Sequence, residues 1–159
     1  MAIIYLSIGS NIDREFNIRS CLTRLKKDHP DIIFSGIYET EAFGFKGDPF
    51  LNLTAMLETD LSPKAVEAYL KTIEDEHHRT REGEKFSSRT LDIDLLLYDQ
   101  LVLHPDMDVP RDEITRYAFV LFPLAEIAPD VLHPILGKSI KELASESKLS
   151  SKNLKEFKL

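Results

Sequence analysis

Arg89-Thr90-Leu91-Asp92-Ile93-Asp94-Leu95-Leu96-Leu97-Tyr98 is the segment whose residue pattern indicates the fold most clearly. Within it, two sets of positions alternate: Leu91, Ile93, Leu95 and Leu97 with Asp92, Asp94, Leu96 and Tyr98. Successive side chains of a β-strand point to opposite faces of a sheet, so this alternation predicts a strand. The two acids then share one face, and Leu91 and Ile93 lie on the other.

The segments before this strand alternate between strand and helix patterns. Residues 3–8 are almost wholly apolar and predict a buried strand, broken by Gly9-Ser10-Asn11. A helix should follow, with Asp13 as its cap and an apolar stripe at helical spacing. Residues 32–38 and 51–57 predict two more strands, and Ser62-Pro63 begins a second helix.

The resulting order, strand-helix-strand-strand-helix-strand, predicts an α+β fold. It is the ferredoxin-like plan βαββαβ, an antiparallel sheet with helices on one face. Beyond residue 100 we expect a C-terminal helical extension around residues 117–127, interrupted by Pro123. Residues 145–159, rich in Ser and Lys, should form a loosely held surface tail. With no internal repeat or linker, residues 1–159 are predicted to form a single domain.

The bulk composition excludes several classes of protein. A net charge of −7 argues against binding nucleic acid, whose phosphates need a basic face. No apolar run approaches the ~20 residues that cross a bilayer, and the N-terminus lacks the basic start of a secretory signal. The single cysteine, Cys21, cannot form an internal disulfide, which favours the cytosol. We expect a cytoplasmic monomer whose partners are small molecules, with no nucleic acid and no membrane.

Asp92 and Asp94 are candidate metal ligands. On one strand face their Cα atoms would lie about 6.5–7 Å apart. Mg²⁺ prefers oxygen ligands and is commonly held by one or two carboxylates together with substrate phosphates. The alternative is a solvated sheet face with two acids, although Asp is unusual in a strongly apolar strand.

A basic cluster precedes the acids. It consists of Arg79, Arg81, Lys85 and Arg89, within eleven positions. Arginine matches the oxygens of a triphosphate with paired donors, so the cluster favours phosphoryl transfer beside a metal. The alternative is an ordinary charged loop that pairs with neighbouring acids.

Several motifs together resemble the 6-hydroxymethyl-7,8-dihydropterin pyrophosphokinase family. The signature at residues 89–98 is the most specific of them. The other matches are Ser7-Ile8-Gly9-Ser10-Asn11, Tyr38-Glu39-Thr40, Phe50-Leu51-Asn52, Ile73-Glu74, Val109-Pro110, Ala118-Phe119-Val120-Leu121-Phe122-Pro123-Leu124 and Glu126-Ile127-Ala128-Pro129. They span residues 3–130 in the family's order.

The resemblance implies transfer of pyrophosphate from ATP to the pterin alcohol in folate synthesis, giving AMP and the pterin pyrophosphate. It implies two Mg²⁺ ions on Asp92 and Asp94, with Arg81 and Arg89 at the phosphates. The nucleotide would further contact Glu74, Arg79, Lys85, Leu95, Arg111 and Arg116. The pterin would contact Thr40, Phe43, Phe50, Asn52 and Phe119. A basic loop, residues 82–89, would close to exclude water.

The chain departs from the family where Arg111 and Tyr117 stand at positions usually held by His and Arg. We expect Arg111 to replace the histidine donor and Arg116 to serve for the missing arginine. Two alternatives stay open: a paralogue acting on another hydroxymethylpterin, and a ferredoxin-like module that binds a ligand without chemistry. Without the resemblance, Phe50 and Phe119 could be plain core, and Asn52 a solvated strand residue.

Overall fold

The computed structural model describes residues 1–41, 47–77 and 91–159. The elements in chain order are β1 (Ala2–Ser10), α1 (Arg14–Asp28), β2 (Ile33–Phe34), β3 (Ile37–Thr40), β4 (Phe50–Thr59), α2 (Pro63–Glu76), β5 (Asp92–Tyr98), α3 (Glu113–Arg116), α4 (Ala118–Ile127), α5 (Ile140–Glu146) and β6 (Lys155–Phe157). In the described part, no helix is both long and apolar enough to cross a membrane.

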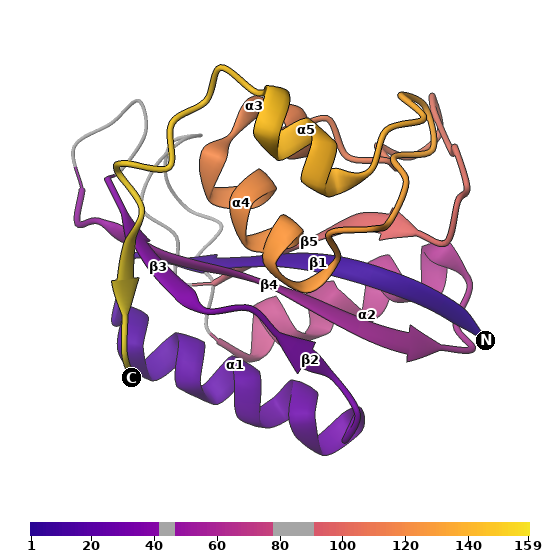
Figure 1. Ribbon diagram of the computed structural model, residues 1–159. Helices are drawn as coiled ribbons and strands as arrows, with labels where there is room; N and C mark the ends of the chain where they lie inside the picture. Colours follow the sequence, from indigo (N-terminus) through magenta and orange to yellow (C-terminus); the bar gives the residue numbers. More distant parts are fainter. Residues whose placement is uncertain (42–46, 78–90) are drawn as a thin grey trace.

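The strands of the described residues form one antiparallel sheet in the order β5-β1-β4-β3-β6, with β2 also paired to β4 (Figure 1). The central pair, β1 and β4, runs in register from Ala2 opposite Thr59 to Ser10 opposite Leu51. The predicted combination of helices with an antiparallel sheet is therefore confirmed. Strand β1 continues through Gly9 and Ser10, two residues beyond its predicted end at Ile8.

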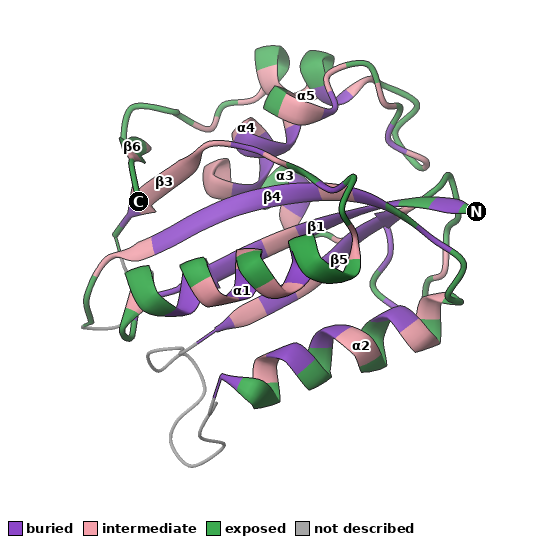
Figure 2. Cartoon of the chain, turned by 90° about the horizontal axis from the view of Figure 1, so that it is seen from below, coloured by how far each residue is buried: buried purple, intermediate pink, exposed green. Residues whose placement is uncertain are grey.

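Helices cover both faces of this sheet. Helices α1 and α2 lie on one face, where their buried sides meet side chains such as Leu6 and Leu53 (Figures 1 and 2). Helices α4 and α5 lie on the other, where Leu121 and Leu124 pack with Tyr5. The predicted one-sided arrangement thus describes α1 and α2 only, because the C-terminal helices bury the second face.

A bulge in β5 changes the predicted alternation. Tyr5 is opposite Leu97 and the next residue, Leu6, is opposite Leu95, so Leu96 is an extra residue in β5. The extra residue reverses the alternation. Leu97 therefore joins Leu96 in the core beneath α4, and its predicted place beside Leu95 is wrong. The acid-bearing start of the strand lies before the bulge and keeps the predicted pattern.

The two helix starts differ from each other. Ser62 caps α2 as predicted: its hydroxyl accepts a hydrogen bond from the Ala65 amide, and Pro63 is the first helical residue. At α1 the cap prediction is wrong. Asp13 adopts a left-handed conformation with φ of 43°, and its carboxylate caps no amide of the described chain. Instead the Asn17 side chain donates to the Ile12 carbonyl and holds the turn.

The second predicted strand and the C-terminal tail also differ from expectation. Residues 32–38 form two strands, because Ser35 turns inward and its hydroxyl accepts from the Thr54 amide of β4. The tail is not loosely held throughout, since β6 pairs with β3. An edge strand presents unpaired backbone donors and acceptors, and β6 satisfies those of β3.

Candidate active site

Asp92 and Asp94 lie half-buried on the same face of β5, as predicted. Strand β5 is at the end of the sheet, and the two acids are opposite Gly9 and Ser7 of β1. Neither β1 partner carries a bulky side chain. The acids therefore lie beside a stretch of sheet surface that is not filled by large side chains from β1.

The surroundings of Asp94 disfavour its charged form. Burial, followed by the negative charge of Asp92, raises the pKa of Asp94 to about 7. The Arg111 guanidinium acts in the opposite direction, with Nη2 placed 3.4 Å from Asp94 Oδ1. Since the repulsion exceeds the attraction, this group of charges favours an additional cation.

Leu96, the extra residue of the β5 bulge, explains how Arg111 reaches its position beside Asp94. Its backbone amide donates to the Leu96 carbonyl at 2.9 Å, which attaches the segment before α3 to the free edge of β5. The guanidinium is further held by Glu113, with Nε 2.7 Å from Oε1. Arg111 is thus fixed at two points beside the acids.

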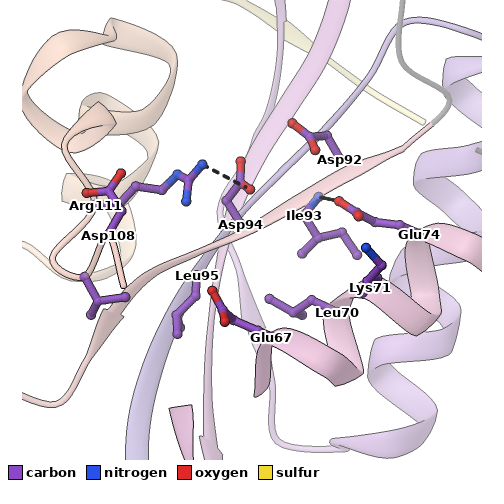
Figure 3. A pocket seen from close by; sticks show the side chains of 11 residues that line it. Glu67, Leu70, Lys71, Glu74, Asp92, Ile93, Asp94, Leu95, Asp108 and Arg111 are labelled. Carbon is purple, nitrogen blue, oxygen red and sulfur yellow. Dashed lines mark hydrogen bonds and ion pairs between the residues drawn. The ribbon is translucent and has the colours of Figure 1, made fainter. Parts of the chain in front are cut away.

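A pocket of about 380 Å³ opens along the edge of β5 (Figure 3). Its lining comes from α2, β5 and the segment before α3: Glu67, Leu70, Lys71, Glu74, Asp92, Ile93, Asp94, Leu95, Asp108, Val109 and Arg111. Glu74 Oε2 accepts a hydrogen bond from the Ile93 amide at 2.9 Å, on the outer edge of the strand. The structure therefore brings Glu74, Leu95 and Arg111, three predicted nucleotide contacts, together with both acids.

Sequence reasoning missed three charged residues of this pocket, Glu67, Lys71 and Asp108. A signal existed for two of them. Glu67, Leu70, Lys71 and Glu74 recur at helical spacing, so all four share one face of α2. Asp108 lies in a segment without regular structure, where no residue spacing pointed to it, although the matched motif Val109-Pro110 follows directly.

Asn52 lies on the same sheet face as the acids, across Gly9. Residues Asp92, Gly9 and Asn52 stand opposite one another on three adjacent strands. Asn52 is buried, and its Nδ2 donates to Thr40 Oγ1 at 2.7 Å. A Cβ added to Gly9 would lie 2.6 Å from Asn52 Oδ1. Glycine at this position therefore leaves room for the amide, a role that the sequence analysis missed.

The aromatic candidates lie on different elements. Phe119 of α4 stacks on Tyr117, with ring centroids 5.1 Å apart and planes inclined by 14°. Phe50 begins β4, opposite Thr40. Arg116 turns to the surface, where Nη1 lies 3.0 Å from Asp112 Oδ2 and the side chain is 58% exposed. It does not line the described pocket, so its contact with nucleotide stays a prediction.

Five predicted site residues lie outside the described residues: Phe43, Arg79, Arg81, Lys85 and Arg89, as does the expected closing loop 82–89. Among the described residues, no group of three or more His, Cys, Asp or Glu side chains is arranged to hold a metal. Two carboxylates still fit Mg²⁺, which usually completes its coordination with substrate phosphates and water.

Comparison with known proteins decides the family. The model of the 7,8-dihydro-6-hydroxymethylpterin-pyrophosphokinase (HPPK) family matches residues 5–129. The chain belongs to this family. It is 36% identical over 152 residues to the 2-amino-4-hydroxy-6-hydroxymethyldihydropteridine pyrophosphokinase of Aquifex aeolicus, covering 94% of both chains. It is 34% identical to the protein of the same name from Pseudomonas aeruginosa, covering 88% of both chains.

Solved HPPK structures share the fold. The chain superposes on Plasmodium falciparum HPPK-DHPS with a TM-score of 0.68 at 16% identity. The match covers 98% of this chain and 47% of the other, so the chain spans about half the length of that HPPK-DHPS protein.

Membership of the HPPK family establishes the activity. The protein is an enzyme that transfers a pyrophosphoryl group from ATP to 6-hydroxymethyl-7,8-dihydropterin in folate synthesis. The alternative of a ligand-binding module without chemistry is therefore set aside.

Proposed function

We propose that Asp92 and Asp94 hold two Mg²⁺ ions and that the pocket along β5 receives ATP. The observation that carries this proposal is the pair of acids on one strand face, with the pKa of Asp94 raised to about 7. Burial and a neighbouring negative charge raise the free energy of one ionised carboxylate, and a bound divalent cation lowers it again. The oxygen donors suit Mg²⁺, and the phosphates of ATP would supply further ligands.

The residues around Asp92 and Asp94 would bind the phosphates and the nucleoside of ATP. Arg111 is fixed by its backbone and by Glu113, so its charge can meet a phosphate with little reorganisation. Glu74 of α2 and Leu95 of β5 both line the pocket and would position the nucleoside. By the family resemblance, Arg81 and Arg89 would contact the transferring phosphates. Arg79 and Lys85, from the basic cluster, and Arg116, in place of the missing arginine, would add basic charge.

The pterin would lie on the sheet face across Gly9 from the acids. Asn52 presents its carbonyl oxygen there, because its nitrogen is engaged by Thr40. A flat bicyclic ring is recognised by stacking faces together with a few fixed polar groups. Phe119 and Phe50 would supply the stacking, with Phe43 as a third candidate from the family resemblance.

In the proposed reaction the pterin hydroxyl oxygen attacks the β-phosphorus of ATP, in line with departing AMP. Mg²⁺, when bound, neutralises phosphate charge and lowers the pKa of the hydroxyl. The residues of this chain position the two substrates and stabilise the developing charge. We assign no side chain as general base.

The proposal also covers the fold plan, the domain organisation, the oligomeric state and the location of the protein in the cell. The order of β1, α1, β3, β4, α2 and β5, with strand order β5-β1-β4-β3, supports a ferredoxin-like plan followed by a C-terminal helical extension. We propose that residues 1–159 form a single domain and act as a monomer. A cytoplasmic location agrees with the single cysteine, Cys21, which is buried and unpaired.

The test is to remove each acid. Asp92→Ala and Asp94→Ala should each lower the rate of AMP release by at least about a hundredfold, worth ~2.7 kcal/mol of transition-state stabilisation. Circular dichroism should stay unchanged. Asp112→Ala is the matched control, because its carboxylate pairs with Arg116 at the surface. Retention of more than about a tenth of the rate at saturating Mg²⁺ by either variant would refute the metal assignment.

A further inference from the structure

Arg14, the first residue of α1, contacts strand β3 near its end and the residue immediately before strand β4. Its Nη2 lies 2.6 Å from Glu39 Oε2 on β3. Its Nη1 donates to the Pro49 carbonyl at 3.1 Å, immediately before β4 begins. Both charged side chains are mostly buried, with 23% and 30% of their surface exposed. One guanidinium therefore fixes the two ends of the hairpin relative to each other.

The C-terminal strand completes this contact. Strand β6 pairs with β3 along its outer edge, which places Phe157 opposite Ile37 and Lys155 opposite Glu39. The Arg14 guanidinium carbon lies 5.1 Å from the centre of the Phe157 ring, a cation–π arrangement. The tail thus covers the guanidinium and limits the directions in which it can move.

Glu39 and Pro49, the two residues held by Arg14, are each next in sequence to a proposed pterin contact. Glu39 precedes Thr40, whose hydroxyl accepts from Asn52, and Pro49 precedes Phe50. Nine residues connect the two strands, too many for a tight turn to set the hairpin geometry by itself. A second hydrogen bond holds the residue before Pro49: Asn11 Nδ2 donates to the Asp48 carbonyl at 3.0 Å.

We propose that Arg14, backed by Phe157, is a positioning residue for the pterin. It holds the hairpin so that Asn52, Thr40 and Phe50 keep a fixed arrangement, although it lies on the opposite sheet face and touches no substrate. The proposal rests on the proposed function, because it takes those three residues as the pterin site. It assigns to the C-terminal strand a part in substrate recognition.

The chain provides a matched control in Arg24, on the same helix. Arg24 also pairs with two carboxylates, those of Asp28 and Glu76, and lies over an aromatic ring, Tyr69, at 5.9 Å. These partners join α1 to α2 and do not involve the hairpin. Arg24→Ala therefore removes a similar set of interactions at a place that the proposal leaves out of pterin binding.

The experiment measures pterin affinity by fluorescence, together with KM and kcat, for Arg14→Ala, Phe157→Ala, Arg24→Ala and Asn52→Ala. Arg14→Ala should weaken pterin binding about tenfold, and Phe157→Ala by a smaller factor, with KM for ATP changed by less than about twofold. Arg14→Lys should recover only part of the loss, since one ammonium cannot match the two-sided guanidinium contact. Arg24→Ala should leave pterin affinity unchanged even where urea unfolding shows equal destabilisation.

Two results would overturn the proposal, and they are distinguishable. If Asn52→Ala weakens pterin binding while Arg14→Ala does not, or while Arg24→Ala weakens it equally, Arg14 has no positioning role. If Asn52→Ala itself leaves pterin affinity unchanged, the proposed pterin site is wrong and the role of Arg14 fails with it.

Discussion

Asp94→Asn should stabilise the substrate-free protein while abolishing turnover. The pKa of Asp94 is raised from 3.8 to about 7 by burial and by Asp92. Between those values the folded protein holds a proton that the unfolded chain has released, so the wild type loses stability as pH rises from about 4 to about 7. Each pKa unit is worth about 1.36 kcal/mol, so the loss reaches about 4 kcal/mol above pH 7. The pKa of Asp94 stays at about 7 although the positive charge of Arg111 lowers it.

The assay is urea unfolding of both proteins at pH 5 and pH 8, in the presence of EDTA. Asparagine cannot ionise, so the variant should be more stable than the wild type at both pH values, with the larger gain, about 4 kcal/mol, at pH 8. Asp112→Asn, whose ion pair with Arg116 lies at the surface and is screened by solvent, serves as the control. An advantage for Asp94→Asn that is absent at pH 8, or equal at both pH values, would refute the reasoning about strained carboxylates.

Two further predictions follow from the site geometry. Arg111→Ala should weaken binding of a non-hydrolysable ATP analogue about tenfold in titration calorimetry. Arg116→Ala should weaken it by a much smaller factor, because that side chain lies at the surface outside the described pocket; equal effects would contradict this division. Gly9→Ala should raise KM for the pterin several-fold with little change in KM for ATP, because the new methyl group would displace the Asn52 amide, 2.6 Å away; an unchanged pterin KM would place the ring elsewhere.

The sequence predicted those parts of the fold that depend on local periodicity. The alternation around Asp92 and Asp94 placed both acids on one face because side-chain direction in a strand is local. The alternation failed at Leu97 because a bulge depends on how β5 aligns with β1. The cap at Asp13 failed because the Asn17 side chain supports the turn instead.

Contacts between residues far apart in the sequence could not be predicted from local sequence patterns. The pairing of residues 155–157 with β3 depends on an edge strand more than a hundred positions earlier in the chain. Gly9 could be recognised as leaving room for Asn52 only when β1 and β4 were aligned. Arg111 was expected from the resemblance, but its place beside Asp94 depends on the Leu96 carbonyl.

The most direct test of the account is a product analysis of the wild-type enzyme. ATP, Mg²⁺ and 6-hydroxymethyl-7,8-dihydropterin are mixed with the protein, and the products are separated by anion-exchange chromatography. We expect AMP and the pterin pyrophosphate in equal amounts, with no ADP formed and no AMP when the pterin is left out. Formation of ADP with a pterin monophosphate, or release of AMP that does not depend on the pterin, would contradict pyrophosphoryl transfer at this site.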